Sequence, residues 1–426
     1  MPTTTGNKAF INFDNGASTP TFIPIWNTVW NVWQQPEILH KEMIPEVKTI
    51  CSKFLNAPES IYDILFTSNT TEAINLVAEN LSFAENKEIE PVVLNTYLEH
   101  NSNELPWRNI SGHKHLPLSV DSDGFINLPE LEATLKAYNK DCIYGKQRII
   151  MVAVTGASNV MGSYNNLEEI SRIAHHYKAQ LLVDAAQMVA HKKTDVLLCN
   201  IDYLAFSAHK TYAPFGTGVL LAKKELLNFP QSIKQQIIQS GEANVGGIAA
   251  LGKALLLLEK IGMHTISSYE KLLTSHVLNG LAKNENISVF GLKQIDASIT
   301  ENKGGVIVFI AKNALPSKTA NQLAFNEGIG VRYGCHCAHI MVKKIHNIGP
   351  GLEKFQGLIT RLFPKVKLPG VVRISFGIYN TITEVDTFLE SLEESNISKK
   401  EIINKATNKK QIIELIKQET IKKIFN

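Results

Sequence analysis

The sequence predicts an α/β protein, with a large domain built on a mainly parallel mixed sheet flanked by helices and a smaller α+β domain at the C-terminal end. From about residue 64 to residue 223, short apolar runs alternate with segments in which apolar residues recur every three or four positions, as in βα units. A chain of 426 residues, 44% hydrophobic and 19% charged, is long enough to bury the cores of two domains.

Six strands are expected in the first domain because six short apolar runs there are bounded by turn residues: 64–66, 92–94, 149–154, 181–183, 203–206 and 218–222. Residues 71–80 and 167–177 show helical spacing between them. Ligands of such sheets bind at the carboxyl ends of the strands. We therefore expect functional residues just after each strand.

The second half of the chain predicts a smaller domain. Residues 247–261 are almost continuously apolar, which indicates a helix buried between domains or at a subunit contact. Strands at 305–310 and 371–376 with flanking helices then indicate an α+β unit. We expect domain boundaries at 1–265 and 266–395, followed by a helical tail at 396–426 whose basic face is solvated.

The overall composition excludes several classes of partner. A net charge of +3 gives no electrostatic reason to expect nucleic acid or lipid. No apolar run approaches the roughly 18 residues of a membrane span, and the first ten residues show no targeting pattern, so a cytoplasmic location is expected. Five cysteines, an odd number, favour reduced thiols over a disulfide framework.

Lys210 is the first candidate functional residue. An apolar strand ends in Ser207 and His209, directly before Lys210, and a loop containing Pro and Gly follows. A partly desolvated lysine beside hydrogen-bond donors can lose its proton and condense with an aldehyde. The alternative is an ordinary surface lysine after a strand.

Two further segments favour the same function for Lys210, the binding of an aldehyde cofactor. Asp184 ends an upstream strand, where a carboxylate can keep a pyridine nitrogen protonated, although a turn or helix cap is the simpler role. Thr70 and Thr71 lie where a strand runs into a helix, so that free backbone N–H groups and hydroxyls can form a phosphate cradle. An ordinary capping box is the alternative. Together the three segments predict a pyridoxal 5′-phosphate (PLP) site.

Four motifs carry a family resemblance. Residues 13–20 read F-D-N-G-A-S-T-P, residues 184–187 read D-x-x-Q, residues 207–218 read S-x-H-K-x-Y-x-P-x-G-x-G, and residues 373–381 read R-I-S-F-G-I-Y-N-T. In these segments the chain resembles the class V aminotransferase superfamily, and within it the Suf-type cysteine desulfurases and selenocysteine lyases. The resemblance implies a homodimeric enzyme of the PLP-dependent transferase fold type I.

The resemblance also implies roles for individual residues. Lys210 would carry PLP as an internal aldimine, Asp184 would face the ring nitrogen, and Gln187 the phenolic oxygen. The phosphate would be bound by Thr70, Thr71, Ser207 and His209. His100, in a segment similar to E-H-x-x-N-x-x-P-W, would stack on the ring and assist proton transfer. Asn159 and Arg373 would bind the substrate carboxylate.

The expected nucleophile lies in the segment G-V-R-Y-G-C-H-C-A at 330–338, which resembles the desulfurase pattern R-x-G-x-x-C-A. This aligns Cys337 with a thiol that takes sulfur from the substrate as a persulfide and leaves alanine; His336 and nearby basic groups could lower its pKa. Cys335 as the nucleophile, purely structural thiols, and a metal site that includes His339 and His346 are the alternatives.

The chain departs from the Suf-type pattern at four places. Residues 225–240 are too few for the usual hairpin, and Glu242 stands where a phosphate-binding Thr is expected. Residues 339–369 form an insertion after the cysteine segment, and Asn69 replaces a Gly.

The leading hypothesis is therefore a cysteine desulfurase or selenocysteine lyase acting on L-cysteine or a related amino acid, with a sulfur-acceptor protein as a further partner. A PLP-dependent C–S β-lyase, epimerase or aminotransferase that does not use the cysteine is the second hypothesis. A binding or scaffold protein without turnover is the third, although such a protein would not need Lys210, Asp184, His100 and Arg373.

Overall fold

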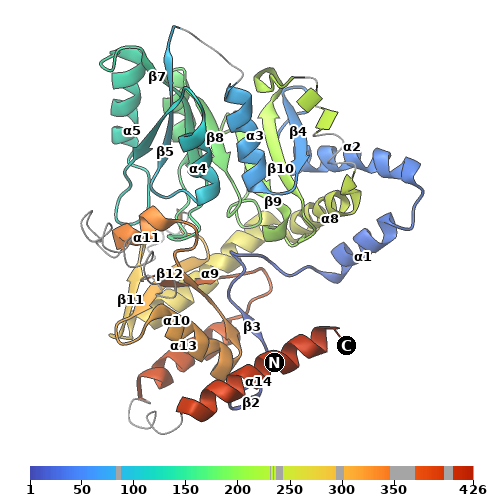
Figure 1. Ribbon diagram of the computed structural model, residues 1–426, viewed down its shortest axis with the longest axis vertical. Helices are drawn as coiled ribbons and strands as arrows, with labels where there is room; N and C mark the ends of the chain where they lie inside the picture. The colour runs from blue at the N-terminus through green and yellow to red at the C-terminus, as the bar shows by residue number, and fades with distance from the viewer. Residues whose placement is uncertain are drawn as a thin grey trace. The chain divides into compact units, whose positions relative to one another are not determined.

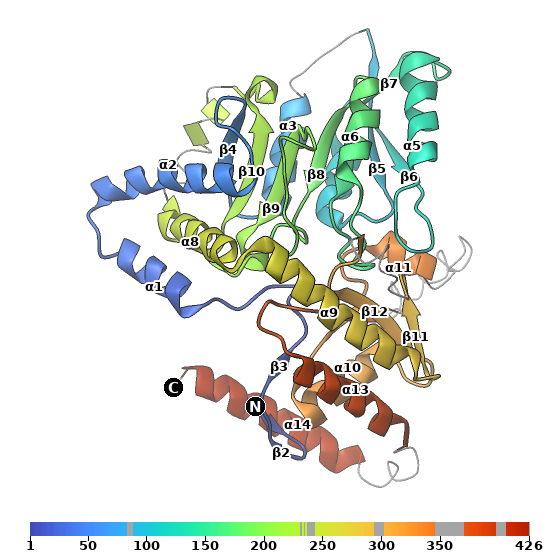
Figure 2. The same ribbon diagram turned by 180° about the vertical axis from the view of Figure 1, so that it is seen from behind.

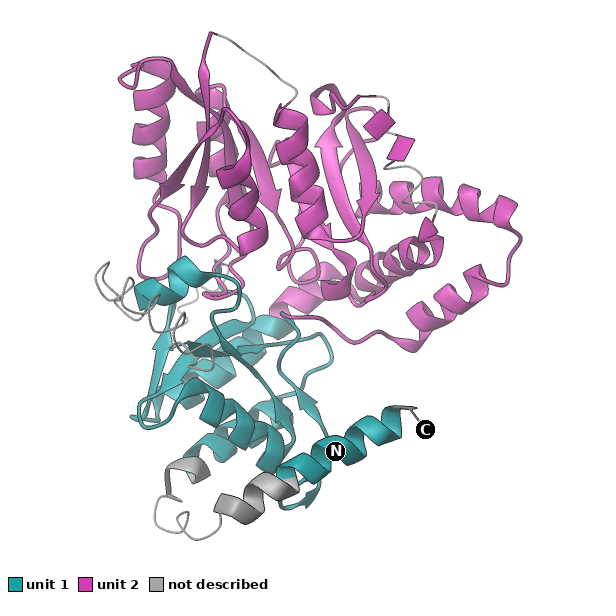
Figure 3. Ribbon diagram, viewed as in Figure 1, with its two compact units in different colours: residues 1–16, 269–426 teal, residues 17–268 magenta. Residues whose placement is uncertain are grey.

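The computed structural model describes residues 1–82, 88–230, 232–233, 235–236, 243–293, 302–345, 370–397 and 406–425. The chain forms two compact units (Figure 3). The large unit is residues 17–268, and the small unit combines residues 1–16 with residues 269–426. The expected division had placed the first 16 residues in the large domain and had set residues 396–426 apart as a tail.

A seven-stranded sheet forms the centre of the large unit. Its strand order is β4 (Tyr62–Thr67), β10 (Gly218–Lys223), β9 (Tyr203–Ser207), β8 (Gln180–Asp184), β7 (Gln147–Thr155), β5 (Glu90–Thr96) and β6 (Lys114–Leu118). β10 pairs antiparallel with both neighbours, and the strands from β9 to β6 are parallel. The predicted mainly parallel sheet and its six strands are confirmed. β6 was not predicted, because this edge strand holds Pro117 and has only one buried residue.

Helices cover both faces of this sheet. α3 (Thr70–Ser82) and α4 (Leu105–Asn109) lie on one face, and α5 (Leu128–Leu135) and α6 (Leu167–His176) lie on the other (Figures 1 and 2). α3 buries its apolar stripe against the sheet in a core cluster that also contains Trp107. The same unit also contains the short elements η1 (Asn101–Asn103), η2 (Lys136–Lys140), η3 (Ala208–Lys210) and η4 (Lys224–Leu226).

The apolar helix expected at 247–261 is α8 (Val245–Ile261). It packs against α1 (Ile23–Val32) and α2 (Glu37–Phe54), which belong to the same unit. Glycines allow the close approach: a Cβ added to Gly246 would lie 2.6 Å from the Trp33 indole nitrogen. Most of the apolar surface of α8 is therefore buried by two neighbouring helices.

The small unit contains an antiparallel sheet in the order β11 (Ile287–Phe290), β12 (Val306–Ala311), β15 (Val371–Ser375) and β14 (Arg332–Gly334). β1 (Pro2–Thr3) pairs with β2 (Gly6–Asn7), and β3 (Ile11–Asn12) pairs in parallel with β13 (Ile329–Gly330). The other described elements are α9 (Met263–Ala282), which begins in the large unit, α10 (Pro316–Gln322), η6 (Leu323–Glu327), α11 (His339–Ile345), α13 (Ile382–Ile397) and α14 (Ala406–Phe425).

The N-terminal segment is part of the small unit's core. Phe13 is fully buried, and its ring meets Phe376 and Phe388 edge to face at centroid distances of 5.5 and 5.8 Å. Such pairs add to the free energy of burying the rings. Residues at the start of the chain therefore help to hold together a unit formed mainly by its last third.

We expect Phe13→Ala to lower the free energy of unfolding by about 3–5 kcal/mol, the usual cost of emptying a buried aromatic site. Phe10→Ala is the matched control, because the Phe10 side chain is 56% exposed, and it should change this free energy by less than about 0.5 kcal/mol. Urea unfolding followed by circular dichroism measures both. Equal effects of the two substitutions would contradict this account of the core.

Candidate active site

Lys210 lies in a tight turn that follows β9. The backbone N–H groups of Thr211 and Ala213 both donate to the Ala208 carbonyl, at 2.9 and 3.0 Å. Tyr212 adopts a left-handed backbone with φ of 66°, a conformation that costs a non-glycine residue free energy unless its surroundings impose it.

Thr19 holds this turn from the other side. Its backbone N–H donates to the His209 carbonyl at 2.8 Å, and its hydroxyl accepts the Tyr212 N–H at 2.8 Å. The half-buried Lys210 side chain therefore extends from a backbone that is fixed by contacts distant in sequence.

Asn244 supports the loop after the lysine turn, a role that the sequence analysis missed. Its side-chain nitrogen donates to the Phe215 and Gly216 carbonyls and to the Thr217 hydroxyl, at 3.1, 2.8 and 3.1 Å. Its oxygen accepts the Gly247 N–H as the N-cap of α8. The only sequence signal was an Asn directly before an apolar helix.

Asp184 ends β8, next to β9 in the sheet. The residue is 4% exposed, and burial raises the pKa of its carboxyl group, against the opposing effects of the Ala186 N–H, which donates at 3.0 Å, and of the positive charge of Lys210. The Lys210 and Asp184 side chains are thus close enough to interact electrostatically. Gln187 and Asn159, the other polar candidates of this unit, are 7% and 6% exposed.

The predicted phosphate residues meet where α3 begins. Thr70 donates its backbone N–H to the Ser207 hydroxyl at 2.7 Å, and the two hydroxyl oxygens are 2.5 Å apart. The loop reaches β10 closely: a Cβ on Gly218 would lie 2.5 Å from the backbone carbon of Asn69. Asn69 itself accepts the Glu72 N–H, so the residue that replaces the expected Gly is a helix cap.

His209 and His100 are held differently. Burial, and then the charge of Lys210, lower the pKa of His209 to about 4, so its ring is neutral at pH 7. The Nδ1 atom of His100 accepts the Ser102 N–H at 3.1 Å, which leaves the proton of the neutral ring on Nε2.

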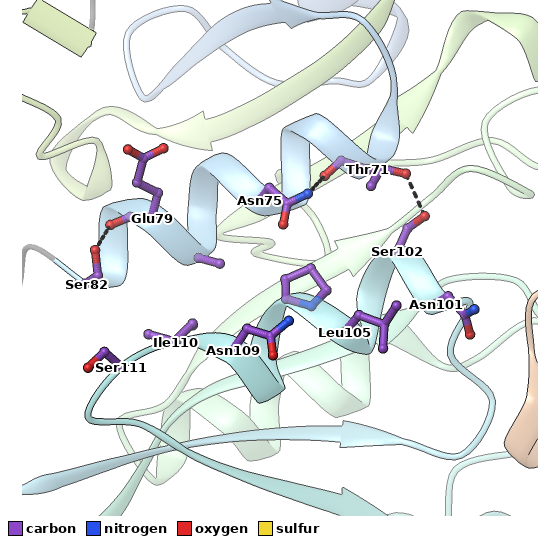
Figure 4. A pocket seen from close by; sticks show the side chains of 12 residues that line it. Thr71, Asn75, Glu79, Ser82, Asn101, Ser102, Leu105, Asn109, Ile110 and Ser111 are labelled. Atoms are coloured by element: carbon purple, nitrogen blue, oxygen red, sulfur yellow. Dashed lines mark hydrogen bonds between the residues drawn. The ribbon is translucent and has the colours of Figure 1, made fainter.

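A hydroxyl chain runs from His100 to α3. The Ser102 hydroxyl lies 2.9 Å from Nδ1 of His100 and 2.7 Å from the Thr71 hydroxyl. Figure 4 shows Thr71 and Ser102 pointing toward each other at one end of a pocket of about 600 Å³ between α3 and the η1–α4 segment. The Thr71 hydroxyl is therefore hydrogen-bonded to the loop that carries His100, whereas the Thr70 hydroxyl is the one that contacts Ser207.

In the small unit, Cys337 lies in a strained turn. The Ala338 N–H donates to the Cys335 carbonyl at 2.9 Å, while His336 and Cys337 have φ values of 52° and 53°. These are features of a type I′ turn, whose central positions favour Gly or Asn. Cys337 is exposed and Cys335 is half-buried, and burial raises the pKa of the Cys335 thiol.

The expectation that His336 helps to lower the thiol pKa is wrong. His336 is 6% exposed, and burial together with the charge of Arg373 lowers its pKa to about 3. Its Nε2 atom hydrogen-bonds to the Val371 carbonyl at 3.2 Å. A neutral imidazole supplies no positive charge, and it is Arg373 that interacts electrostatically with Cys337.

Arg373 lies in β15 with 2% of its surface exposed. Burial lowers its pKa, and Asp14 opposes this effect by accepting a hydrogen bond from Nη2 at 3.0 Å. The other Asp14 oxygen is 3.7 Å from Arg332. Asp14 is a second residue that the sequence analysis did not select, although it lies inside the motif at 13–20.

The candidate residues thus form two groups, each within one unit. Lys210, His100, Asn159, Gln187 and the remaining cofactor candidates are in the large unit, and Cys337 and Arg373 are in the small unit. Glu242, His346 and most of the insertion at 339–369 lie outside the described residues. Within the described ranges, no three His, Cys, Asp or Glu side chains are arranged to hold a metal ion, and none of the helices has the length and apolar character needed to cross a bilayer.

Comparison with known proteins identifies the family. The model of the family described as "Aminotransferase class-V" matches residues 37–388, and the chain belongs to that family. A Synechococcus elongatus protein named "Cysteine desulfurase" is 32% identical over 361 residues, which is 80% of this chain and 51% of that protein. A "Probable cysteine desulfurase" of Halalkalibacterium halodurans is 30% identical over 80% of both chains.

Solved structures agree with this fold. The apo structure of the cysteine desulfurase from Thermococcus onnurineus has a TM-score of 0.75 at 26% identity, and the similarity covers 91% of this chain and 94% of that chain. The Escherichia coli cysteine desulfurase CsdA gives a TM-score of 0.73 at 22% identity, with 91% and 94% coverage. The α/β fold of the chain is therefore that of the PLP-dependent fold type I proteins.

The strained turn makes a prediction that does not depend on activity. Cys337→Gly should unfold at a higher temperature than Cys337→Ala, because glycine adopts a φ of 53° without the cost of about 1 kcal/mol that alanine incurs. Differential scanning calorimetry of the two variants measures the difference. Equal melting temperatures would show that the turn is not strained at this position.

Proposed function

We propose that the chain is a PLP-dependent cysteine desulfurase, which takes sulfur from L-cysteine or selenium from L-selenocysteine, releases alanine and leaves the chalcogen on Cys337. The observation that carries the proposal is the charge interaction between Lys210 and Asp184 at the ends of two adjacent strands, in a chain whose curated relatives are named cysteine desulfurases. The cytoplasmic location stays a prediction.

The large unit offers a donor set that fits PLP. The paired Thr70 and Ser207 at the start of α3 provide hydroxyls and a helix N-terminus for a phosphate. Asp184 would bind the ring nitrogen, Gln187 the phenolic oxygen, and Thr71 and His209 would complete the phosphate contacts. When bound, the cofactor supplies an electron-withdrawing ring conjugated to the substrate α-carbon.

Lys210 and His100 are the proposed proton carriers. The Lys210 amine, held in its turn by Thr19, would take the proton from the substrate α-carbon. Nδ1 of His100 accepts the Ser102 N–H, so in the neutral ring Nε2 is the atom that would carry the proton to be donated. Asn159 and Arg373 would orient the substrate through its carboxylate, and Asp14 would hold the Arg373 guanidinium for this contact.

Cys337 is the proposed nucleophile. Its thiolate would form a bond to the substrate sulfur while the bond between that sulfur and the β-carbon breaks. The electron pair remains with the β-carbon, which gains a proton and becomes the methyl group of alanine. The Arg373 guanidinium interacts electrostatically with Cys337, and the exposure of Cys337 is consistent with later transfer of the sulfur to an acceptor protein.

The decisive measurement is to incubate the purified protein with L-cysteine and to quantify alanine, pyruvate and sulfide. We expect alanine as the product, a loss of at least about 10²-fold in Cys337→Ala, and near-normal activity in the matched variant Cys335→Ala. Pyruvate and ammonia, formed equally by Cys337→Ala, would instead identify a β-lyase. A purified protein without the visible absorption band of a lysine-bound cofactor would leave only a scaffold role.

An exposed apolar face on α1 supports the expected homodimer. Its residues recur at helical spacing: Ile23, Trp26, Trp30 and Trp33 are 76%, 58%, 64% and 55% exposed. Contiguous apolar surface of this kind marks an interface in a folded protein. The Trp26 ring lies 5.8 Å from that of Phe215, so a second copy bound here would cover the loop that follows Lys210.

Substituting the centre of this face tests the dimer. Trp30→Asp should convert the dimer to a monomer in sedimentation-velocity experiments, because burying an unpaired carboxylate is strongly unfavourable. Ile143→Asp, at an apolar residue that is 67% exposed and lies outside α1, is the control and should remain dimeric. A dimer that persists in Trp30→Asp would place the interface elsewhere.

A further inference from the structure

Glu99 is a buried carboxyl group beside the candidate site. It follows β5 by three residues and is 4% exposed. Its two oxygens have different partners: Oε1 lies 2.6 Å from the Thr96 hydroxyl, and Oε2 accepts a hydrogen bond from the Asn103 side-chain nitrogen at 2.6 Å. These contacts join the end of β5 to the last residue of η1.

The orientation of Asn103 is fixed by Trp107. The indole nitrogen of Trp107 can only donate, and it does so to the Asn103 side-chain oxygen at 3.0 Å. The amide nitrogen of Asn103 must therefore face Glu99, so Oε2 of Glu99 is an acceptor. When Glu99 is ionised, the Thr96 hydroxyl donates to Oε1. In the neutral acid the proton is on Oε1 and this bond reverses, since the Thr96 oxygen, which also accepts the Leu98 N–H at 3.1 Å, has a second lone pair for it.

The surroundings of Glu99 favour that proton. Burial raises the pKa of Glu99 to about 8, and the charge of Asp184 adds to this effect. Hydrogen bonds from Thr96, Asn103 and the Thr155 backbone oppose it without cancelling it. Burial disfavours a carboxylate that has no positively charged partner, because the protein interior solvates its charge less well than water does.

We propose that Glu99 is a positioning residue which, as a neutral carboxylic acid, ties the loop that carries His100 to the ends of β5 and β7 without adding a second negative charge beside Asp184. The inference rests on the proposed function for the role of His100. Thr155 ends β7, the strand between β5 and β8, so the Glu99 network spans the strand ends next to Asp184.

The neutrality of Glu99 matters because two nearby carboxylates titrate as a coupled pair. A negative Glu99 would favour a proton on Asp184, whose proposed task requires the ionised form. The other charged or titratable groups around the network do not alter this: His115 bonds to Asn95 at 2.8 Å and has its pKa lowered to about 4, mainly by burial. Further groups are His100, Lys210, whose charge acts on Asp184, and the Glu104–Arg108 ion pair.

The first test is the pH dependence of thermal stability in Glu99→Gln. In the wild-type protein Glu99 keeps its proton in the folded state up to pH 8 but releases it near pH 4.3 when unfolded, so its contribution to stability falls as pH rises through this window. Glutamine carries no such proton. The melting temperature of Glu99→Gln minus that of the wild type should therefore rise from pH 5 to pH 8 and then level off.

Glu104→Gln is the matched control. Glu104 is 6% exposed and lies five residues further along, but its carboxyl pairs with Arg108. The melting temperature of this variant, relative to the wild type, should not rise with pH. A flat or falling difference for Glu99→Gln, or failure of this near-isosteric variant to fold, would mean that Glu99 is needed as an anion and would overturn the proposal.

The second test asks whether Glu99 positions His100. In the holoenzyme, Glu99→Gln should keep the visible circular dichroism of bound PLP and a kcat within a few-fold of the wild type. Glu99→Ala should lose that dichroism, with kcat reduced about 10²-fold and little change in KM. A Glu99→Ala enzyme with unchanged dichroism would overturn the positioning role. A wild-type protein without desulfurase activity would contradict the proposed function. The pH dependence of the melting temperature would still test whether Glu99 is protonated, because that measurement does not require activity.

Discussion

The burial of the Asp184 carboxyl group beside the positive charge of Lys210 is the constraint on which the proposed cofactor site depends. Burial works against the ionised form of Asp184, and the lysine charge together with the Ala186 N–H works for it. Asp184 ends β8, and Lys210 follows the neighbouring parallel strand β9 by three residues, at the edge where such sheets bind their ligands. The order β9–β8–β7–β5 then determines which other loops reach the same edge, and those loops carry His100 and Asn159.

The sequence predicted most of the fold because buried parallel strands read as short, continuous apolar runs. It failed at β6, where an edge strand with Pro117 and one buried residue lacks that signal. Thr70 and Ser207 could be selected from motifs, and the structure brings them together. Glu99, Asn244 and Asp14 could not be assigned roles, because their importance depends on burial and on partners from other elements, which no local pattern encodes.

The two proposed reactive side chains are held in opposite ways. Lys210 extends from a turn fixed by contacts from Thr19, whereas Cys337 stands exposed in a turn with two left-handed residues, neither of them glycine. A backbone conformation that is unfavourable for the residues that adopt it persists only where the surroundings impose it, and such positions concentrate at functional sites. Around this turn, His336 is buried and hydrogen-bonded to the Val371 carbonyl, and Arg373, held by Asp14, interacts electrostatically with Cys337.

The distribution of tryptophan has a practical consequence. The chain holds four tryptophans, of which Trp26, Trp30 and Trp33 are exposed on or just after α1, while Trp107 is fully buried against α3. Emission from the α1 tryptophans should therefore be red-shifted in a free subunit and move to shorter wavelength when a second copy covers them, whereas Trp107 in α4 should emit at short wavelength in both states. Quenching by a soluble agent such as acrylamide would separate the two contributions, so the protein contains its own optical reporter for events at α1, without any attached dye.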